Sequence, residues 1–210
     1  MKIIEPSYHI LTKLDRGNIL KTLELCGRSS YKSEDKITKS SAENFVKMLI
    51  DRGHESVLEH FGFSVKFICD RGVSHELVRH RLASYTQESS RYCNYSDDKF
   101  GNEITFIRPL FFTNHSTYIT WRMACQNAEE SYFTLLNKYH CKPEEARSVL
   151  PNSLKTEIIM TANLREWRHF FKLRTHKSAH PQMRQLTIPL LKELQEKIPI
   201  IFEDIEIIDQ

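Results

Sequence analysis

The stretch that decides the fold is residues 61–70, which read Phe-Gly-Phe-Ser-Val-Lys-Phe-Ile-Cys-Asp. Apolar side chains fill every second position, from Phe61 through Val65 to Cys69. Because successive side chains of a strand point to opposite faces, this two-residue period predicts a β-strand with one face in the core. Gly72 follows this strand and precedes a helix that we expect over residues 73–82.

Two helices and another strand are expected before this stretch. Short apolar bursts predict a strand within residues 2–14, and a helix over residues 18–26 is expected to stop near Gly27. Residues 40–43 read Ser-Ser-Ala-Glu, the spacing of a capping box in which hydroxyl and carboxylate satisfy free backbone N–H groups. The apolar positions behind this box predict a second helix, closed by Gly53.

The later part of the chain has mainly helical patterns. Helices are expected at four places: residues 116–139 as one long amphipathic helix, a short helix opened by Pro143, residues 165–173, and residues 182–197 with a kink at Pro189. Residues 84–95 form a polar segment, and residues 104–107 predict a short strand. Residues 154–162 and 200–210 fit either strand or helix. The sequence therefore predicts one α+β domain over residues 1–210, a small antiparallel or mixed sheet packed with helices.

The composition narrows the class of protein. A length of 210 residues suits one domain, and a net charge of +3 is well below that of a dedicated DNA-binding protein. The five cysteines show no CxxC spacing, so neither a disulfide framework nor a thiolate zinc site is expected. Without a signal-peptide core or an apolar run of about 18 residues, a cytoplasmic protein with no membrane partner is expected.

The densest polar cluster is residues 79–91, which read Arg-His-Arg-Leu-Ala-Ser-Tyr-Thr-Gln-Glu-Ser-Ser-Arg. Arginine forks and serine hydroxyls suit a phosphate, while Gln87 and Glu88 can read the donor and acceptor edges of a base. If the preceding helix reaches Arg81, its guanidinium points partly toward the apolar face, where it needs an acid or a bound anion. From the residues alone, a charged helix end followed by a polar loop is the alternative.

This cluster closely resembles the signature of the flavin-dependent thymidylate synthases, which is RHR, seven residues, Ser, one residue and Arg. All fixed positions of that signature are present: Arg79, His80, Arg81, Ser89 and Arg91. Three further segments resemble the family in the same order: residues 54–60 (HESVLEH), 146–151 (ARSVLP) and 163–174 (NLREWRHFFKLR). The resemblance covers about residues 54–184.

The resemblance implies a homotetramer that binds FAD between subunits, with dUMP stacked on the flavin. The residues implied to bind FAD are Ser56, Glu59, Arg79, His80, Arg81, Gln87, Asn163, Arg165 and His169. The residues implied to bind dUMP are Glu76, Arg79, Gln87, Glu88, Ser89, Ser90, Arg91, Arg147 and Arg174. NADPH and methylenetetrahydrofolate are implied as co-substrates, and neither a metal nor a nucleic acid is implied.

The resemblance also implies individual roles. Arg91 and Arg147 are expected at the phosphate of dUMP. Arg174 is expected to be catalytic, because a guanidinium beside the uracil favours ionisation of its ring imide. No enzyme cysteine acts as nucleophile in this family, so Cys93 is expected to be a small packed side chain. Two positions depart from common family members: Glu76 stands where a Gln is often found, and His169 stands where an Asn occurs.

Two other classes of protein account for some of the same residues. A metal-dependent hydrolase would use the histidines at positions 54, 60, 75 and 80, although the chain lacks an HExxH motif. A nucleic-acid-binding module would use the basic and aromatic residues of 165–174, although the aromatic ones suit a buried helix face better. Flavin colour, stoichiometric metal or salt-dependent oligonucleotide binding distinguishes the three classes.

Overall fold

The computed structural model of the protein describes residues 1–91, 95 and 101–208, and Cys93 lies outside the described residues. The chain forms two compact units. Unit 1 contains Met1–Ser7, Phe67–Arg79 and Thr86–Ile159, and unit 2 contains Tyr8–Lys66, His80–Tyr85 and Met160–Gln210. The organisation of residues 1–210 as a single domain stays a prediction.

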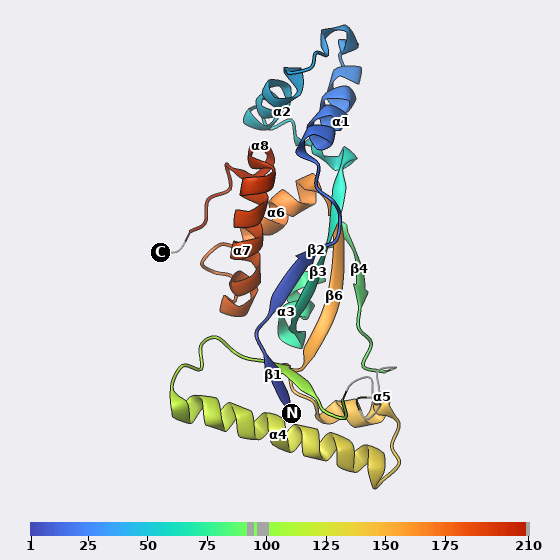
Figure 1. The fold of residues 1–210 in the computed structure, drawn as a ribbon, viewed down its shortest axis with the longest axis vertical. Helices are drawn as coiled ribbons and strands as arrows, with labels where there is room; N and C mark the ends of the chain where they lie inside the picture. The colour runs from blue at the N-terminus through green and yellow to red at the C-terminus, as the bar shows by residue number, and fades with distance from the viewer. Residues whose placement is uncertain (92–94, 96–100, 209–210) are drawn as a thin grey trace. The chain divides into compact units, whose positions relative to one another are not determined.

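The main sheet has four strands in the order β2-β3-β6-β4 (Figure 1). Their bounds are Ser7–Ile10 for β2, Gly62–Asp70 for β3, Lys155–Asn163 for β6 and Ala83–Gln87 for β4. Burial alternates along β3, where Phe63, Val65 and Phe67 are fully buried. This alternation confirms the strand expected from the two-residue period.

Strands β3 and β6 run antiparallel. The N–H of Leu164 donates to the carbonyl of Phe61 at one end (2.9 Å), and the N–H of Arg71 donates to the carbonyl of Leu154 at the other (3.2 Å). Residue numbers thus rise along one strand and fall along its partner. Gly62 allows a close approach between these strands, because a Cβ at this position would lie 2.9 Å from the carbonyl oxygen of residue 162.

Unit 1 contains a second sheet, in which β1 (Lys2–Ile4) pairs in parallel with β5 (Thr105–Ile107). Its helices are α3 (Arg71–Leu77), α4 (His115–Asn137), α5 (Pro143–Ala146) and the 3-10 turn η4 (Arg147–Val149). Phe106 of β5 is buried in one apolar cluster with Cys125 and Tyr132 of α4. The long helix therefore packs against the two-stranded sheet, below β1 in Figure 1.

Unit 2 contains most of the remaining helices. They are α1 (Arg16–Ser29), η1 (Glu34–Lys36), α2 (Ser41–Asp51), η2 (Glu55–His60), α6 (Leu164–Arg174), α7 (Pro181–Lys197) and α8 (Pro199–Phe202). Helix α6 packs on the sheet through Trp167, which stacks on Phe63 with ring centroids 4.8 Å apart. Its indole N–H also donates to the Phe63 carbonyl (3.1 Å), so this large side chain is both buried and hydrogen-bonded.

The structure confirms the α+β fold and most of the expected helices and strands. The structure has the N-terminal strands, the strand within residues 104–107, the long helix, the short helix opened by Pro143 and both C-terminal helices. It also assigns residues 155–163 to the strand β6, whereas in the segment 200–210 the helix α8 extends only to Phe202 and residues 203–208 are neither helix nor strand. Homo-oligomeric assembly stays a prediction.

Four expectations about local structure were wrong. Helix α1 continues through Gly27, because glycine leaves room for α2 there: a Cβ would lie 2.6 Å from the ring of Phe45. The capping box is not formed, since the side chain of Ser40 makes no capping hydrogen bond. Helix α3 ends at Leu77, short of the expected position 82. The expected polar segment begins with residues of β4, which is a strand of the main sheet.

Candidate functional site

The RHR triplet lies in the connection from α3 to β4 and not on a helix. Asp70 caps α3 by accepting a hydrogen bond from the N–H of Val73 (2.8 Å). Because the helix ends at Leu77 and does not reach Arg81, the condition for placing this guanidinium toward the apolar face is not met, and Arg81 is exposed. The buried member of the triplet is His80, with 5% exposure.

His80 links two charged residues of α6. Its Nδ1 lies 3.1 Å from a carboxylate oxygen of Glu166, and its Nε2 accepts a hydrogen bond from Nε of Arg174 (3.0 Å). Burial lowers the pKa of His80, and the charge of Arg174 lowers it further, against the raising effect of the Glu166 carboxylate. The structure therefore holds a neutral imidazole between an acid and the residue expected to be catalytic.

Several of the residues implied to bind FAD line one cavity of about 420 Å³ in unit 2. Glu59, Arg81 and Asn163 lie on its wall. Arg165 pairs with Glu59 through a 2.6 Å contact, and Asn163 caps α6 by accepting from the N–H of residue 166 (2.9 Å). The cavity wall thus combines an acid, an amide and the guanidinium of Arg81, a donor and acceptor set that suits a polar cofactor with an anionic part.

Three further residues implied to bind FAD, Ser56, His169 and Arg79, lie outside the lining of this cavity. Ser56 is exposed on η2, close in sequence to Glu59. His169 is exposed on α6, with its ring centroid 5.9 Å from that of His80. Arg79 is exposed at the end of unit 1, and the cavity lining does not include it.

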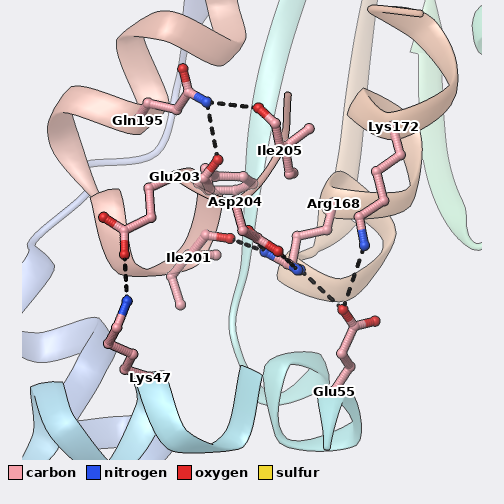
Figure 2. A network of polar contacts seen from close by, with 10 residues as sticks. Lys47, Glu55, Arg168, Lys172, Gln195, Ile201, Glu203, Asp204 and Ile205 are labelled. Atoms are coloured by element: carbon pink, nitrogen blue, oxygen red, sulfur yellow. Dashed lines mark hydrogen bonds and ion pairs between the residues drawn. The ribbon is translucent and has the colours of Figure 1, made fainter. Parts of the chain in front are cut away.

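A buried arginine anchors the η2 segment that carries Ser56 and Glu59. Arg168 is 2% exposed; its Nε donates to a carboxylate oxygen of Glu55 (3.2 Å), and both terminal nitrogens donate to Asp204 (2.6 Å each) (Figure 2). Burial of a guanidinium requires such partners. The sequence did not predict this role, because Arg168 lies in a basic run that suggested nucleic-acid binding.

The aromatic residues of that run are also unavailable for stacking on bases. Trp167, Phe170 and Phe171 are fully buried and pack on one another, with ring centroids 5.3–5.7 Å apart. The alternative in which they form one buried helix face is confirmed. This arrangement removes the main support for the nucleic-acid-binding reading of residues 165–174.

Unit 1 brings together residues implied to bind dUMP. Nη1 of Arg147 donates to Oγ of Ser90 (3.1 Å), and Ser90 is 5% exposed. The side-chain nitrogen of Gln87 donates to the hydroxyls of Ser74 (2.9 Å) and Thr156 (3.2 Å), which fixes its amide. A guanidinium, a buried hydroxyl and an oriented amide thus lie in the same unit as the signature residues Arg79, Ser89 and Arg91, whereas His80 and Arg81 belong to unit 2.

A backbone N–H group helps to position the neighbouring signature residues Ser89 and Arg91. The Oγ of Ser89 accepts a long hydrogen bond from the N–H of Arg91 (3.4 Å), a local turn that keeps these two residues together. Arg91 is exposed, as a residue expected to meet a phosphate should be. Glu76 lies in α3 and is half-buried. Contacts of these residues with a nucleotide stay predictions.

Glu88 has a partner that sequence reasoning missed. Nζ of Lys155 lies 3.0 Å from Glu88 and 2.7 Å from Glu157, and the hydroxyl of Tyr95 donates to Glu88 (3.4 Å). Burial acts to lower the pKa of Lys155, but the two carboxylates outweigh it and the pKa is raised. The period-two placement of residues 155 and 157 on one strand face is a signal that could have revealed this pair of partners.

One group among the described residues could offer three ligand atoms to a metal ion: His80, Glu166 and His169, within 4.8 Å of one another. The guanidinium of Arg174 already donates to Nε2 of His80, so a cation here would meet a positive charge. The histidines at 54, 60 and 75, proposed for the hydrolase alternative, are exposed and do not belong to this group.

The cysteines of the described chain do not resemble activated nucleophiles. Cys26, Cys69, Cys125 and Cys141 are free thiols. Burial raises the pKa of the Cys69 thiol and raises that of Cys125 to about 11. Because the thiolate is the reactive form, both buried thiols are held in their unreactive state at neutral pH.

The fold and these residues define an α+β protein with polar groups suited to anionic nucleotides. Comparison with known proteins identifies the class further, since the profile of the thymidylate synthase complementing protein family matches residues 14–200. The chain is 36% identical to the flavin-dependent thymidylate synthase of Pyrococcus furiosus, over 81% of this chain and 70% of that protein. It is equally identical to the enzyme of the same name from Mycolicibacterium vanbaalenii, over 94% and 83%.

The chain therefore belongs to the flavin-dependent thymidylate synthase family, as its signature residues indicated. Geobacter sulfurreducens contains another such relative, 36% identical over 81% of this chain and 72% of its own length. Among the described residues, no helix combines the length and the apolar character needed to cross a bilayer.

Proposed function

We propose that the protein converts dUMP to dTMP by reductive methylation, with methylenetetrahydrofolate as carbon donor and FAD reduced by NADPH. Family membership supports the reaction, since the relatives are named as flavin-dependent thymidylate synthases. The structural observation that carries the proposal is the pair of Ser90 and Arg147. These residues, 57 positions apart in the chain, form a hydroxyl–guanidinium pair suited to a phosphate.

The nucleotide would be held mainly by residues of unit 1. Arg147 and Arg91 supply permanent cations for the phosphate, and Ser89 and Ser90 add hydroxyl donors. Gln87 would face the base with its amide oxygen, because the amide nitrogen already donates to the hydroxyls of Ser74 and Thr156. An acceptor that is fixed in this way loses little conformational entropy when a ligand binds. Glu76, Glu88 and Arg79 complete the set as polar neighbours of the base and sugar.

Arg174 would act on the uracil ring. A guanidinium close to the ring imide stabilises its anion, lowers the pKa of the imide, and so raises electron density on the ring carbon that is methylated. Arg174 is half-buried and is held at its Nε by His80. A cation that is partly shielded from water acts more strongly than an exposed one, because water screens it less.

The residues of the 420 Å³ cavity fit the polar parts of FAD. Exposed Arg81 is suited to the pyrophosphate, and Asn163 and Glu59 offer an amide and a carboxylate to the ribityl chain and the ring. Ser56, Arg165 and His169 would add further polar contacts. FAD held by these residues would supply hydride-transfer chemistry to the reaction. The protein chain contributes binding, orientation and charge.

A cytoplasmic homotetramer that shares FAD and dUMP sites between subunits completes the proposal. Glu59 and Arg81 on the cavity wall are exposed, and a neighbouring subunit would cover them. Light scattering and flavin titration test this directly. A monomer that holds FAD tightly would contradict a shared site.

The proposed reaction is tested with the purified protein, its visible flavin spectrum and dTMP formation from dUMP. We expect a yellow protein that forms dTMP only with NADPH and methylenetetrahydrofolate. In Arg147→Gln, dUMP affinity should fall by about tenfold or more, because a charge-assisted contact to the phosphate is lost. Arg122→Gln, which removes an equal charge from the exposed face of α4, is the matched control. A colourless protein that cannot take up FAD would overturn the proposal.

A further inference from the structure

Arg174 is held by hydrogen bonds to both its side chain and its backbone. Its Nε donates to Nε2 of His80 (3.0 Å), and its backbone carbonyl accepts a hydrogen bond from the hydroxyl of Thr187 (2.8 Å). Because a guanidinium is planar and rigid, a fixed Nε also fixes the plane in which the two terminal nitrogens lie. The orientation of Arg174 therefore depends on an acceptor at one atom of His80.

That acceptor exists in only one form of the imidazole. If Nε2 accepts from Arg174, the ring proton must be on Nδ1, which lies 3.1 Å from the carboxylate of Glu166. The backbone of His80 is held as well, since the Tyr85 hydroxyl donates to its carbonyl (2.9 Å). Phe170 packs edge-on against the ring, with centroids 4.9 Å apart. The ring is thus fixed in place, in orientation and in tautomer.

We propose that His80 is a positioning residue for Arg174: Glu166 keeps the ring proton on Nδ1, and the lone pair of Nε2 orients the guanidinium. This inference rests on the proposed function, since it assumes that Arg174 acts on the nucleotide. It differs from the role implied by the signature, in which His80 lines the flavin. A buried imidazole oriented by a carboxylate is a common way to fix which nitrogen accepts.

The charged and titratable groups around His80 favour its neutral form. They are Glu166, His169 and Arg174 from α6 and Tyr85 from β4. Burial, followed by the charge of Arg174, lowers the pKa of His80 despite the opposing effect of Glu166. Burial raises the pKa of Tyr85 to about 12, so its hydroxyl remains a donor. Protonation of His80 at acid pH would remove the acceptor and place a second cation beside Arg174.

Two substitutions separate positioning from mere packing. In His80→Gln, the side-chain oxygen can occupy the place of Nε2 and accept from Arg174; in His80→Asn, the shorter amide reaches only the place of Nδ1. We expect His80→Asn to lose about tenfold or more in dUMP affinity and kcat, whereas His80→Gln retains most of both. Flavin content and thermal stability are measured for both variants. Equal losses in the two variants would overturn the proposal.

The pH dependence and the ring nitrogens provide independent readouts. The wild-type protein should lose dUMP affinity as the pH falls through the lowered pKa of His80, which lies below the ordinary histidine value of about 6.5, and His80→Gln should lack this loss because an amide does not titrate. Nitrogen NMR of the histidine rings should show a neutral His80 with its proton on Nδ1. A proton on Nε2 would overturn the inference. If the tautomer is as expected but no dTMP forms, the proposed function fails instead.

Discussion

Arg168 and Asp204 form a two-pronged ion pair: Nη1 and Nη2 of the guanidinium each donate to one oxygen of the carboxylate, both at 2.6 Å (Figure 2). The arginine is 2% exposed, whereas the side chain of Asp204 is 44% exposed. Nη1 also donates to the carbonyl of Ile201, and Nε to Glu55. One buried side chain thus joins α6, the segment after α8 and η2.

Replacement of this arginine should destabilise unit 2. Arg168→Met leaves the carbonyl of buried Ile201 without this donor and the carboxylates of Glu55 and Asp204 without their cation, so we expect a loss of about 2–4 kcal/mol in the free energy of unfolding. Asp204→Asn should cost less, about 1–2 kcal/mol, because the carboxylate is partly solvated and Arg168 keeps its contacts with Glu55 and Ile201. Urea denaturation measures both variants.

A matched control for these variants is the nearby surface pair of Lys47 and Glu203, 2.9 Å apart. Both side chains are about half exposed, and such pairs contribute little to stability. Glu203→Gln should therefore shift the free energy of unfolding by less than about 0.5 kcal/mol. A loss in Glu203→Gln as large as that in Arg168→Met would show that burial does not determine the effect.

The same ion pair should make stability depend on pH in the acid range. Burial acts to raise the pKa of Asp204, but the hydrogen bond and charge of Arg168 outweigh it, and the pKa lies below its ordinary value of 3.8. A group with a lowered folded-state pKa stabilises the fold above its unfolded-state pKa and loses this contribution as the pH falls. Wild-type stability should therefore decrease below about pH 4 more steeply than that of Asp204→Asn. Parallel pH curves for the two proteins would contradict the prediction.

Arg91 provides a test of the phosphate site that is independent of Arg147. We expect Arg91→Ala to raise the dissociation constant for dUMP by about tenfold or more, because a charge-assisted contact contributes about 1.5–3 kcal/mol. Deoxyuridine, which lacks the phosphate, should bind both proteins equally weakly. Isothermal titration measures both ligands, with Arg122→Ala as the control for loss of an exposed charge. An unchanged dUMP isotherm would remove Arg91 from the phosphate site.

The sequence predicted elements whose pattern is local and missed those decided by tertiary contacts. The two-residue period of strand β3 lies entirely within its own sequence, so this strand was predicted correctly. Strand β4 was missed because its exposed and half-buried positions, at Ala83 through Gln87, have little apolar character. Gly27 suggested a helix end. In the structure, a glycine is needed there because the ring of Phe45, from another helix, leaves no room for a side chain.

The candidate site shows the same division. The family resemblance placed Ser90, Arg147 and His80 among the functional residues, and the structure gives each of them a polar partner. The partners could not be predicted from their residue types alone, because Glu166 and Lys155 are two of many charged residues in this chain. Only the fold brings Glu166 to His80, 86 positions away, and Lys155 to Glu88, 67 positions away.

Lys155 should control the charge of the nucleotide site through Glu88. Its ammonium lies between Glu88 and Glu157, at 3.0 and 2.7 Å, and is 20% exposed. In Lys155→Met two carboxylates face each other without a cation, and their charge opposes the anionic nucleotide; dUMP affinity should fall by about tenfold, and more strongly at low salt. Glu157→Gln, which keeps the Lys155–Glu88 pair, should bind dUMP at least as well as wild type. If Lys155→Met binds dUMP normally at low salt, the Glu88 carboxylate does not face the nucleotide.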